Sequence, residues 1–104
     1  MTTDLILMLT TMPDDDRADG LARTLVDARL AACVNVSSPM TSTYRWQGGV
    51  EAERERQVVI KTTRTHLAAV EARVRSLHPY ELPELVVIEA SASDAYAAWV
   101  REST

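Results

Sequence analysis

Apolar positions in the N-terminal part of the chain follow the periods of a strand, a helix and a second strand. Residues 5–9 are all apolar, which predicts that residues 4–11 form a strand inside a sheet. Three aspartates at positions 14–16 suit the positive end of a helix, and apolar residues spaced at three and four extend this helix to about Leu30. Residues 31–36 are predicted as the second strand.

The remaining pattern predicts a long hairpin, a helix, a strand and a last short helix. Strands at 41–46 and 50–63 flank a turn signal at Gln47-Gly48-Gly49. Charges alternate in the first half of the return strand and its second half is apolar, so the hairpin is expected to project beyond the core and then enter it. Thr65 is expected to cap a helix that ends near Leu77, because a proline restricts the residue before it. A strand at 84–88 and a helix at 94–101 follow.

This order of elements, β-α-β-β-α-β-α, predicts an α+β domain of the ferredoxin-like type. Its first six elements form the split βαβ arrangement, βαββαβ, and a short C-terminal helix follows them. Right-handed crossovers place both long helices on one face of the sheet. The other face needs a cover, and another subunit is the simplest candidate. With 104 residues the chain is expected to form a single domain, 1–104.

Composition excludes several classes of function. The net charge is −4 and no basic run occurs, which argues against binding of nucleic acid. The longest early apolar run has five residues, too short for a membrane span, so no membrane partner is expected. The single cysteine suits a cytoplasmic location. No Gly-rich phosphate loop, Gly-x-Ser-x-Gly elbow or His-Glu-x-x-His helix is present, and the chain is not expected to be an enzyme.

Three residues are candidates for metal or thiol chemistry. His78 follows a predicted helix and precedes Pro-Tyr-Glu. It either bonds terminal carbonyls, with its charged form favoured by the helix dipole, or it binds a metal such as copper or carries a proton. Cys33 is expected to be a small buried hydrophobe, since no neighbouring base would activate it. His66 is expected at the surface.

The hairpin and the strand that follows it supply further candidates. Glutamates at 51, 53 and 55 share one strand face, with arginines on the other, which indicates a solvated arm or, as the alternative, a site for a hard cation. Tyr44 and Trp46 share a face, which suits packing or an interface, or else the stacking of bases. Lys61 lies at the buried end of a strand, where it is expected to pair with Glu55, Glu81 or Glu84, or to bind an anion.

Five blocks of the sequence resemble the divalent-cation tolerance protein CutA family. They are Ala-Ala-Cys-Val-Asn at 31–35, Ser-Thr-Tyr-Arg-Trp-Gln-Gly at 42–48, Ile-Lys-Thr at 60–62, His-Pro-Tyr-Glu-Leu-Pro-Glu at 78–84, and Tyr-x-x-Trp at 96–99. The resemblance implies a ferredoxin-like core and a compact homotrimer, similar to the PII signal proteins, in which the hairpin arm packs against neighbouring subunits. It also implies tolerance of copper and other divalent cations, binding of Cu(II) by some members, and no established reaction.

Carrying the family's proposed copper ligands over leaves one residue. Thr10 stands where a cysteine is proposed and Leu77 where the first of two histidines is proposed, so His78 alone remains as a metal ligand. The first hypothesis is therefore a metal-responsive homotrimer that needs no cofactor and binds Cu(II) or a similar ion at His78. The second is a PII-like small-ligand sensor or adaptor without a metal site, and the third is an enzyme that uses Lys61, His78 and Glu81. In the sensor hypothesis, clefts between subunits would bind the ligand. They would be lined by Asn35, Tyr44, Trp46, Lys61, Tyr80 and Glu81.

Overall fold

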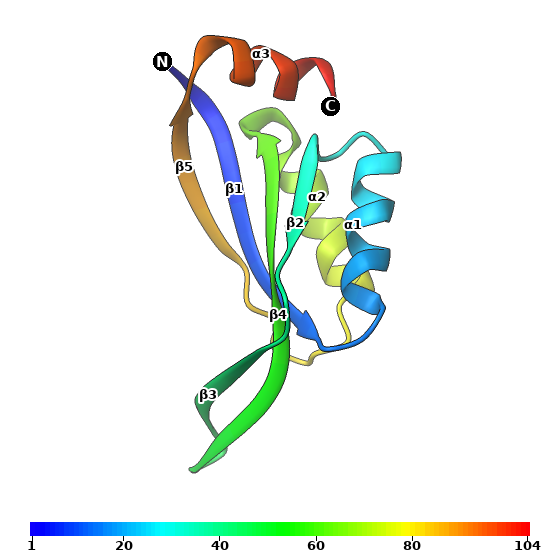
Figure 1. The fold of residues 1–104 in the computed structure, drawn as a ribbon, viewed down its shortest axis with the longest axis vertical. Coiled ribbons are helices and arrows are strands. Elements are labelled where there is room, and N and C mark those ends of the chain that lie inside the picture. The colour runs from blue at the N-terminus through cyan, green and yellow to red at the C-terminus, as the bar shows by residue number, and fades with distance from the viewer.

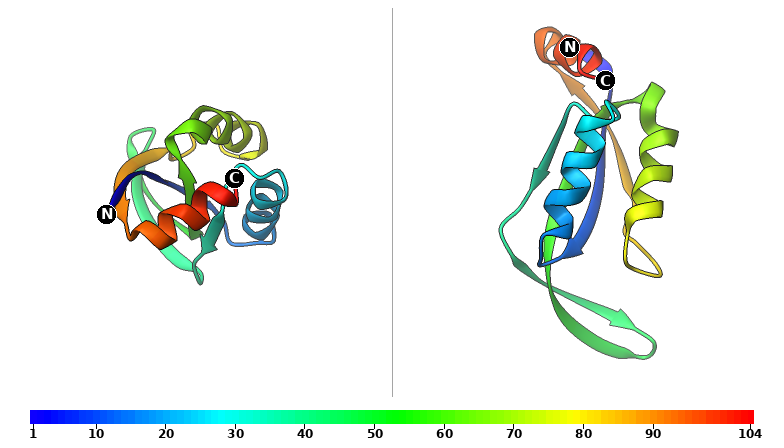
Figure 2. Two further views of the ribbon diagram at one scale, coloured as in Figure 1. Left: turned by 90° about the horizontal axis from the view of Figure 1, so that it is seen from above. Right: turned by 90° about the vertical axis from the view of Figure 1, so that its right-hand side faces the viewer.

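The structure is a five-stranded antiparallel sheet with two helices on one face (Figures 1 and 2). The computed structural model describes residues 1–104, leaving aside the side chains of residues 2 and 3. The strands run in the order β2-β4-β1-β5, and β3 pairs with β4. This confirms the predicted ferredoxin-like α+β fold with its C-terminal helix. The elements are β1 (Thr2–Pro13), α1 (Arg17–Asp27), β2 (Cys33–Val36), β3 (Met40–Trp46), β4 (Gly49–Thr63), α2 (Leu67–Leu77), β5 (Val86–Ala92) and α3 (Asp94–Glu102).

The hydrophobic core lies between the sheet and the helices α1 and α2. Alternation along the two central strands sends Met8 of β1 and Ile60 of β4 toward the helices, and these two residues are direct partners in the ladder. They pack with Leu25 of α1 and Val70 of α2, all four being fully buried. A second cluster forms where Val100 of α3 packs near Leu5 of β1. Helix α3 therefore covers only one end of the opposite sheet face (Figure 2).

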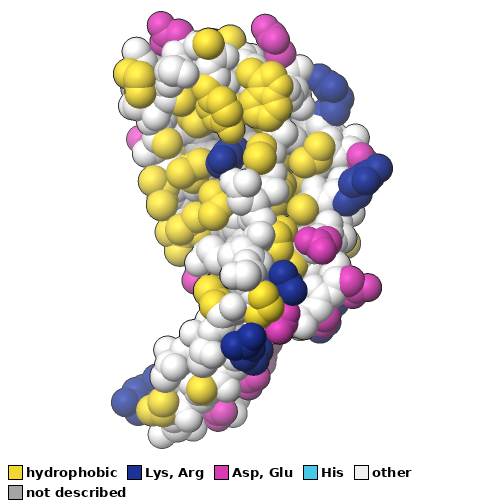
Figure 3. Space-filling model, viewed as in Figure 1, with side chains coloured by type: hydrophobic (Ala, Val, Ile, Leu, Met, Phe, Trp, Pro, Cys, Tyr) yellow, Lys and Arg dark blue, Asp and Glu magenta, His cyan; other side chains and the backbone are white. Residues whose placement is uncertain are grey.

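The rest of that opposite face is mostly apolar, and no helix of the described chain covers it; we call it the open face. Two cross-strand rows form it: Ile88, Leu7, Lys61 and Cys33 in one, and Val86, Leu9, Val59 and Asn35 in the other. Ile88 is 42% exposed, and Tyr96 and Trp99 of α3 extend the apolar surface beside it. Figure 3 shows hydrophobic side chains gathered over β5 and α3 on this side of the molecule.

The hairpin of β3 with residues 49–55 of β4 projects from the body, and we call it the arm (Figure 1). It gives the molecule its length of 45 Å, against 25 and 24 Å in the other directions. Its tip turns through Gln47 and Gly48, whose φ angles of 48° and 83° are those of the tight turns that fit the twist of a hairpin. The prediction that the hairpin projects beyond the core is confirmed.

Some element boundaries differ from the prediction. Helix α1 ends at Asp27 and not at Leu30, because Arg29 takes a left-handed φ of 58°. The amide of Arg29 then bonds the carbonyl of Val26 and the amide of Leu30 bonds that of Leu25, which closes the helix in a Schellman motif without the usual glycine. Strand β5 begins at Val86 and runs to Ala92.

The cap of the second helix also differs. Thr65 lies within a short 3₁₀ turn, Arg64–His66, and α2 starts only after His66. The predicted end of α2 at Leu77 is confirmed, and His78 follows it in extended backbone, as expected for the residue before a proline. In the part of the chain that the structure describes, no helix has the length and apolar character to span a bilayer.

Candidate functional site

The two faces of the arm differ in chemistry because of the register of β3 against β4. Tyr44 lies opposite Glu51, and two positions away on either side Ser42 lies opposite Glu53 and Trp46 opposite Gly49. Since side chains alternate along a strand, both aromatic residues and all three glutamates of the arm point to the same face. Arg45 and Arg54 belong to the alternate positions. Sequence periodicity predicted each half of this pattern, but only the register shows that the aromatic and acidic residues share a face.

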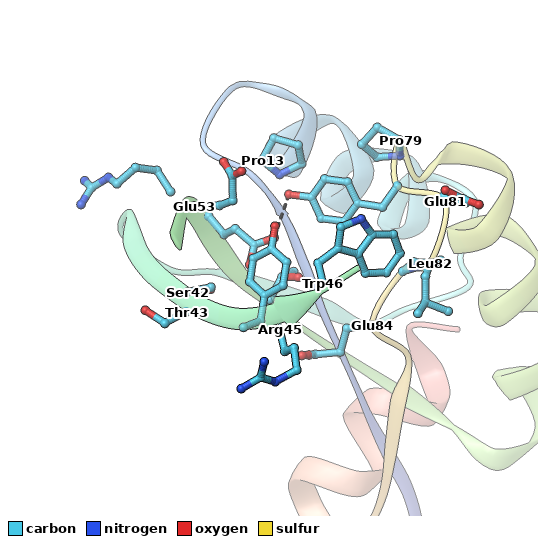
Figure 4. A pocket seen from close by; sticks show the side chains of 16 residues that line it. Pro13, Ser42, Thr43, Arg45, Trp46, Glu53, Pro79, Glu81, Leu82 and Glu84 are labelled. Carbon is cyan, nitrogen blue, oxygen red and sulfur yellow. Dashed lines mark hydrogen bonds between the residues drawn. The ribbon is translucent and has the colours of Figure 1, made fainter. Parts of the chain in front are cut away.

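A groove of about 1050 Å³ lies between this face and the loop 79–84 that follows α2 (Figure 4). Trp46 extends from β3 toward Leu82, while Arg45 points away from the loop. Four of the six residues predicted for a ligand cleft meet here within one chain, namely Tyr44, Trp46, Tyr80 and Glu81.

A buried carboxylate anchors the groove at the base of the arm. Glu55 pairs with Pro13 of β1 in the ladder and is only 7% exposed. The Tyr80 hydroxyl donates a hydrogen bond of 2.7 Å to its Oε2 atom. Burial, with the neighbouring Glu55, raises the pKa of Tyr80 far above its usual value, so the phenol stays protonated and keeps donating. The prediction of a solvated row of glutamates was therefore wrong for Glu55, because the base of the arm lies against β1 and the 79–84 loop.

His78 is held between the loop and β1 by both ring nitrogens. The Tyr80 amide donates to Nδ1 at 3.2 Å, which places the ring proton on Nε2, and Nε2 donates to the Thr11 carbonyl at 2.7 Å. The Thr10 hydroxyl lies 3.2 Å from Nε2. Burial lowers the pKa of His78, so the neutral ring is favoured. The expectation of a charged ring bonded to carbonyls of its own helix was wrong, because the ring turns toward β1.

The residues of one chain do not fit a copper site at His78. Copper favours a thiolate or several imidazoles, and no group of three His, Cys, Asp or Glu side chains converges anywhere among the described residues. The hydrogen-bond partners of the ring are a hydroxyl and a carbonyl of β1 and the amide of Tyr80, and Leu77 is exposed. A metal ion at His78 would also have to displace one of its two hydrogen bonds.

Lys61 and Asn35 lie on the open face and not in the groove. Lys61 stands opposite Cys33 of β2, and its ammonium lies 6.0 Å from the centre of the Tyr96 ring. The predicted pairing of Lys61 with Glu55, Glu81 or Glu84 was wrong, since none of the ion pairs between described side chains involves it. Cys33 is a free thiol. It was predicted to be buried, and the structure shows it half-buried. A cleft holding all six predicted residues would need surfaces of two chains.

Comparison with known proteins settles the relationship that the sequence blocks suggested. A family model described as CutA1 divalent ion tolerance protein matches residues 6–103. The chain belongs to this family. A divalent-cation tolerance protein CutA of Thermus thermophilus is 41% identical over 99 residues, which cover 94% of this chain and 96% of the relative. The family is named for tolerance of divalent ions and not for a reaction, in accord with the expectation of a protein that is not an enzyme.

Solved structures agree with this assignment. The structure of CutA from Synechococcus elongatus superposes with a TM-score of 0.92 at 46% identity, covering 98% of this chain and 91% of that one. CutA from Xylella fastidiosa gives a TM-score of 0.93 at 40% identity, covering 97% and 98%. The fold of this chain, including the projecting arm and the C-terminal helix, therefore matches these two CutA structures along nearly its whole length.

Tyr80→Phe should lower the free energy of unfolding by about 1–3 kcal/mol, the cost of a buried acceptor that loses its donor. The substitution leaves Glu55 buried beside an apolar ring edge. Urea denaturation followed by circular dichroism measures the loss. Tyr44→Phe is the matched control, because Tyr44 is half-exposed and makes no hydrogen bond through its hydroxyl among the described contacts, and a change of less than about 0.5 kcal/mol is expected there. Equal effects of the two substitutions would contradict the role of the Tyr80–Glu55 bond.

The lowered pKa of His78 predicts that the protein loses stability as the pH falls below 6.5, the ordinary value for histidine. As the pH falls through this window, His78 takes up a proton in the unfolded chain before it does so in the folded protein, which stabilises the unfolded state. The loss of stability levels off below the pKa that His78 has in the folded protein. The measurement compares the free energy of unfolding of the wild type with that of His78→Gln from pH 7.5 to pH 5. The advantage of the wild type should shrink as the pH falls; a constant or growing advantage would contradict the burial of a neutral ring.

Proposed function

We propose that this chain acts in divalent-cation tolerance as a homotrimer whose subunits join through the open face of the sheet. The observation that carries the proposal is the open face itself, where two rows of mostly apolar side chains are left without a covering helix. Monomers in water rarely expose contiguous apolar surface of this kind. The resemblance to the CutA family supplies the number of subunits, since it implies trimers of PII-like form.

The arm supports the same assembly. Strand β3 pairs with β4 along one edge only, and the amides and carbonyls of its other edge face away from the sheet. An unpaired edge is a template for pairing with another chain unless it is protected. The arm is expected to reach a neighbouring subunit, which would cover this edge.

The thiol of Cys33 provides a direct test of which face is covered. It lies within the open face, in one row with Ile88 and Lys61, and is the only thiol of the chain. In the assembled protein, alkylation of Cys33 should be slow, and dilution to dissociating concentrations should accelerate it. A rate that is fast and independent of protein concentration would show that the open face stays accessible, and would contradict the proposed interface.

Coordination of Cu(II) or another divalent ion by His78 remains a separate prediction. Calorimetric titration of the trimer with Cu(II), beside His78→Ala and Cys33→Ser, tests it. Binding that disappears only in His78→Ala would support a ligand role for this histidine. Absent binding, or binding equal in all three proteins, would leave the sensor hypothesis as the better description of the site.

The lone free thiol suits a reducing compartment, and we assign the protein to the cytoplasm on this ground.

The geometry within one chain favours that second candidate, a small-ligand sensor or adaptor. The groove gathers four of its predicted residues, whereas His78 has both nitrogens engaged in hydrogen bonds. The volume of the groove, about 1050 Å³, lies close to the upper end of the range for small-molecule sites, about 300–1000 Å³.

A further inference from the structure

We infer that the groove between the arm and the 79–84 loop binds a small organic cation carrying an ammonium group. The inference rests on the sensor candidate proposed above, and it names the class of ligand that the groove of each chain would take. Three features point to this ligand class: aromatic faces, carboxylates without a cationic partner, and the marginal position of the basic side chains.

Aromatic side chains supply the first feature. Tyr44 and Trp46 of β3 line the groove from the arm, and Tyr80 lines it from the loop. Tyr44 and Trp46 are 40% and 37% exposed, so their rings remain accessible to a ligand. The face of an aromatic ring attracts a cation, tryptophan most strongly, and ammonium groups are commonly recognised by aromatic residues arranged around them.

Carboxylates supply the second feature, and Glu55 is the most telling of them. Its side chain is almost wholly buried, yet its only hydrogen-bond partner among the described residues is the neutral hydroxyl of Tyr80. No described lysine or arginine side chain lies within ion-pair distance of it. A carboxylate buried beside a neutral partner attracts a nearby cation, so an ammonium group in the groove would find a favourable position there.

Other glutamates extend the negative field along the groove. Glu53 lies one pleat further out on the same face as Glu55, and Glu81 and Glu84 line the loop side. Burial is the largest cause of the raised pKa of Tyr44, and the charges of Glu53, Glu51 and Glu55 raise it further. The field of these carboxylates therefore acts on the aromatic side of the groove.

Basic side chains lie at the margin of this surface. Arg45 and Arg54 touch the margin of the groove, but they occupy the alternate positions of β3 and β4, and Arg45 points away in Figure 4. Arg56 is bound to Asp14 on the far side of the arm base. Within the groove the four glutamates outnumber the two marginal arginines, which favours a cationic ligand over anionic metabolites and phosphate esters.

An organic cation also fits better than a metal ion. Among the described residues, the carboxylates of the groove do not converge in a group of three that could hold a metal ion. Hard divalent cations need six or more oxygen ligands, or keep several waters. Rings set around spread carboxylates instead match a larger ion whose charge is distributed over methyl or methylene groups.

Choline and its neutral carbon analogue, in which a tert-butyl group replaces trimethylammonium, form a matched pair of probes. Calorimetric titration of the wild-type chain should show choline binding at least about 10-fold tighter than the analogue, a difference of about 1.4 kcal/mol that the positive charge supplies. Trp46→Leu should weaken choline binding by about 2- to 30-fold, the factor for about 0.5–2 kcal/mol of cation–π attraction. Glu53→Gln should also weaken it.

Glu89→Gln is the control for the loss of one charge, because Glu89 is exposed on β5 and does not line the groove. It should bind choline as the wild type does. Equal affinity for choline and its analogue, unchanged binding in both groove variants, or displacement of choline by stoichiometric Cu(II) would overturn the inference. Absence of choline binding would also overturn the inference; a side chain of a neighbouring subunit that fills the groove would have this effect. Light scattering on the same samples keeps a failure of assembly separate from a failure of binding.

Discussion

Ile88→Asp is expected to convert the assembled protein into monomers. Ile88 lies in the edge strand β5, in one row with Leu7 and Lys61, and is an exposed apolar residue of the open face. Assembly would bury the new carboxylate against apolar side chains of a neighbouring subunit. Each buried carboxylate without a counter-ion weakens association by several kcal/mol. Because a trimer repeats the substitution at every interface, the effect should exceed that of any single surface change. Sedimentation velocity at micromolar concentration measures it.

Val87→Asp is the matched control for this prediction. Val87 is the next residue in β5 and is 44% exposed, but it pairs with Met8 and so points to the other face of the sheet. Glu89, two residues on, already places an exposed carboxylate on that side. The control should therefore remain assembled. Dissociation of both variants, or of neither, would mean that the open face is not the subunit interface.

Ile60→Ala should lower the free energy of unfolding by about 2–5 kcal/mol, the usual cost of truncating a fully buried aliphatic side chain. Ile60 is wholly buried in β4, between Met8 of β1 and Val34 of β2, and the helices close over it. Neighbours on both sides in the sheet limit how far the cavity can collapse. Urea denaturation at one fixed protein concentration measures the loss, because dissociation and unfolding are coupled in an oligomer.

Val50→Ala provides the comparison for Ile60→Ala. Val50 lies near the tip of the arm, is 67% exposed, and should cost less than about 0.5 kcal/mol when truncated. A loss at Ile60 no larger than the loss at Val50 would contradict the assignment of the core.

Hydrophobic periodicity was sufficient for the fold, because nearly every element buries a face whose period is visible in the sequence. It also placed Tyr44 with Trp46, and separated the glutamates of the arm from its arginines, since alternation along a strand is a local property. The Schellman end of α1 escaped prediction because Arg29 takes the left-handed position where glycine is usual.

The site depends on pairings that no local pattern contains. That Glu55 is buried follows from its ladder partner Pro13 and from Tyr80, residues 42 positions earlier and 25 positions later in the chain. The hydrogen bond from His78 to Thr11 spans 67 positions. The resemblance to the CutA family marked the segments that meet at the arm base, but the register of β3 against β4 was needed to show that aromatic and acidic side chains face one groove.

The molar mass of the wild-type protein in solution tests the central claim most directly. Size-exclusion chromatography with multi-angle light scattering, at micromolar concentration, should give three times the chain mass of 11.5 kDa if the open face joins subunits in a trimer. A mass of 11.5 kDa that persists as the concentration rises would show that the open face is left uncovered, and would contradict the proposed assembly.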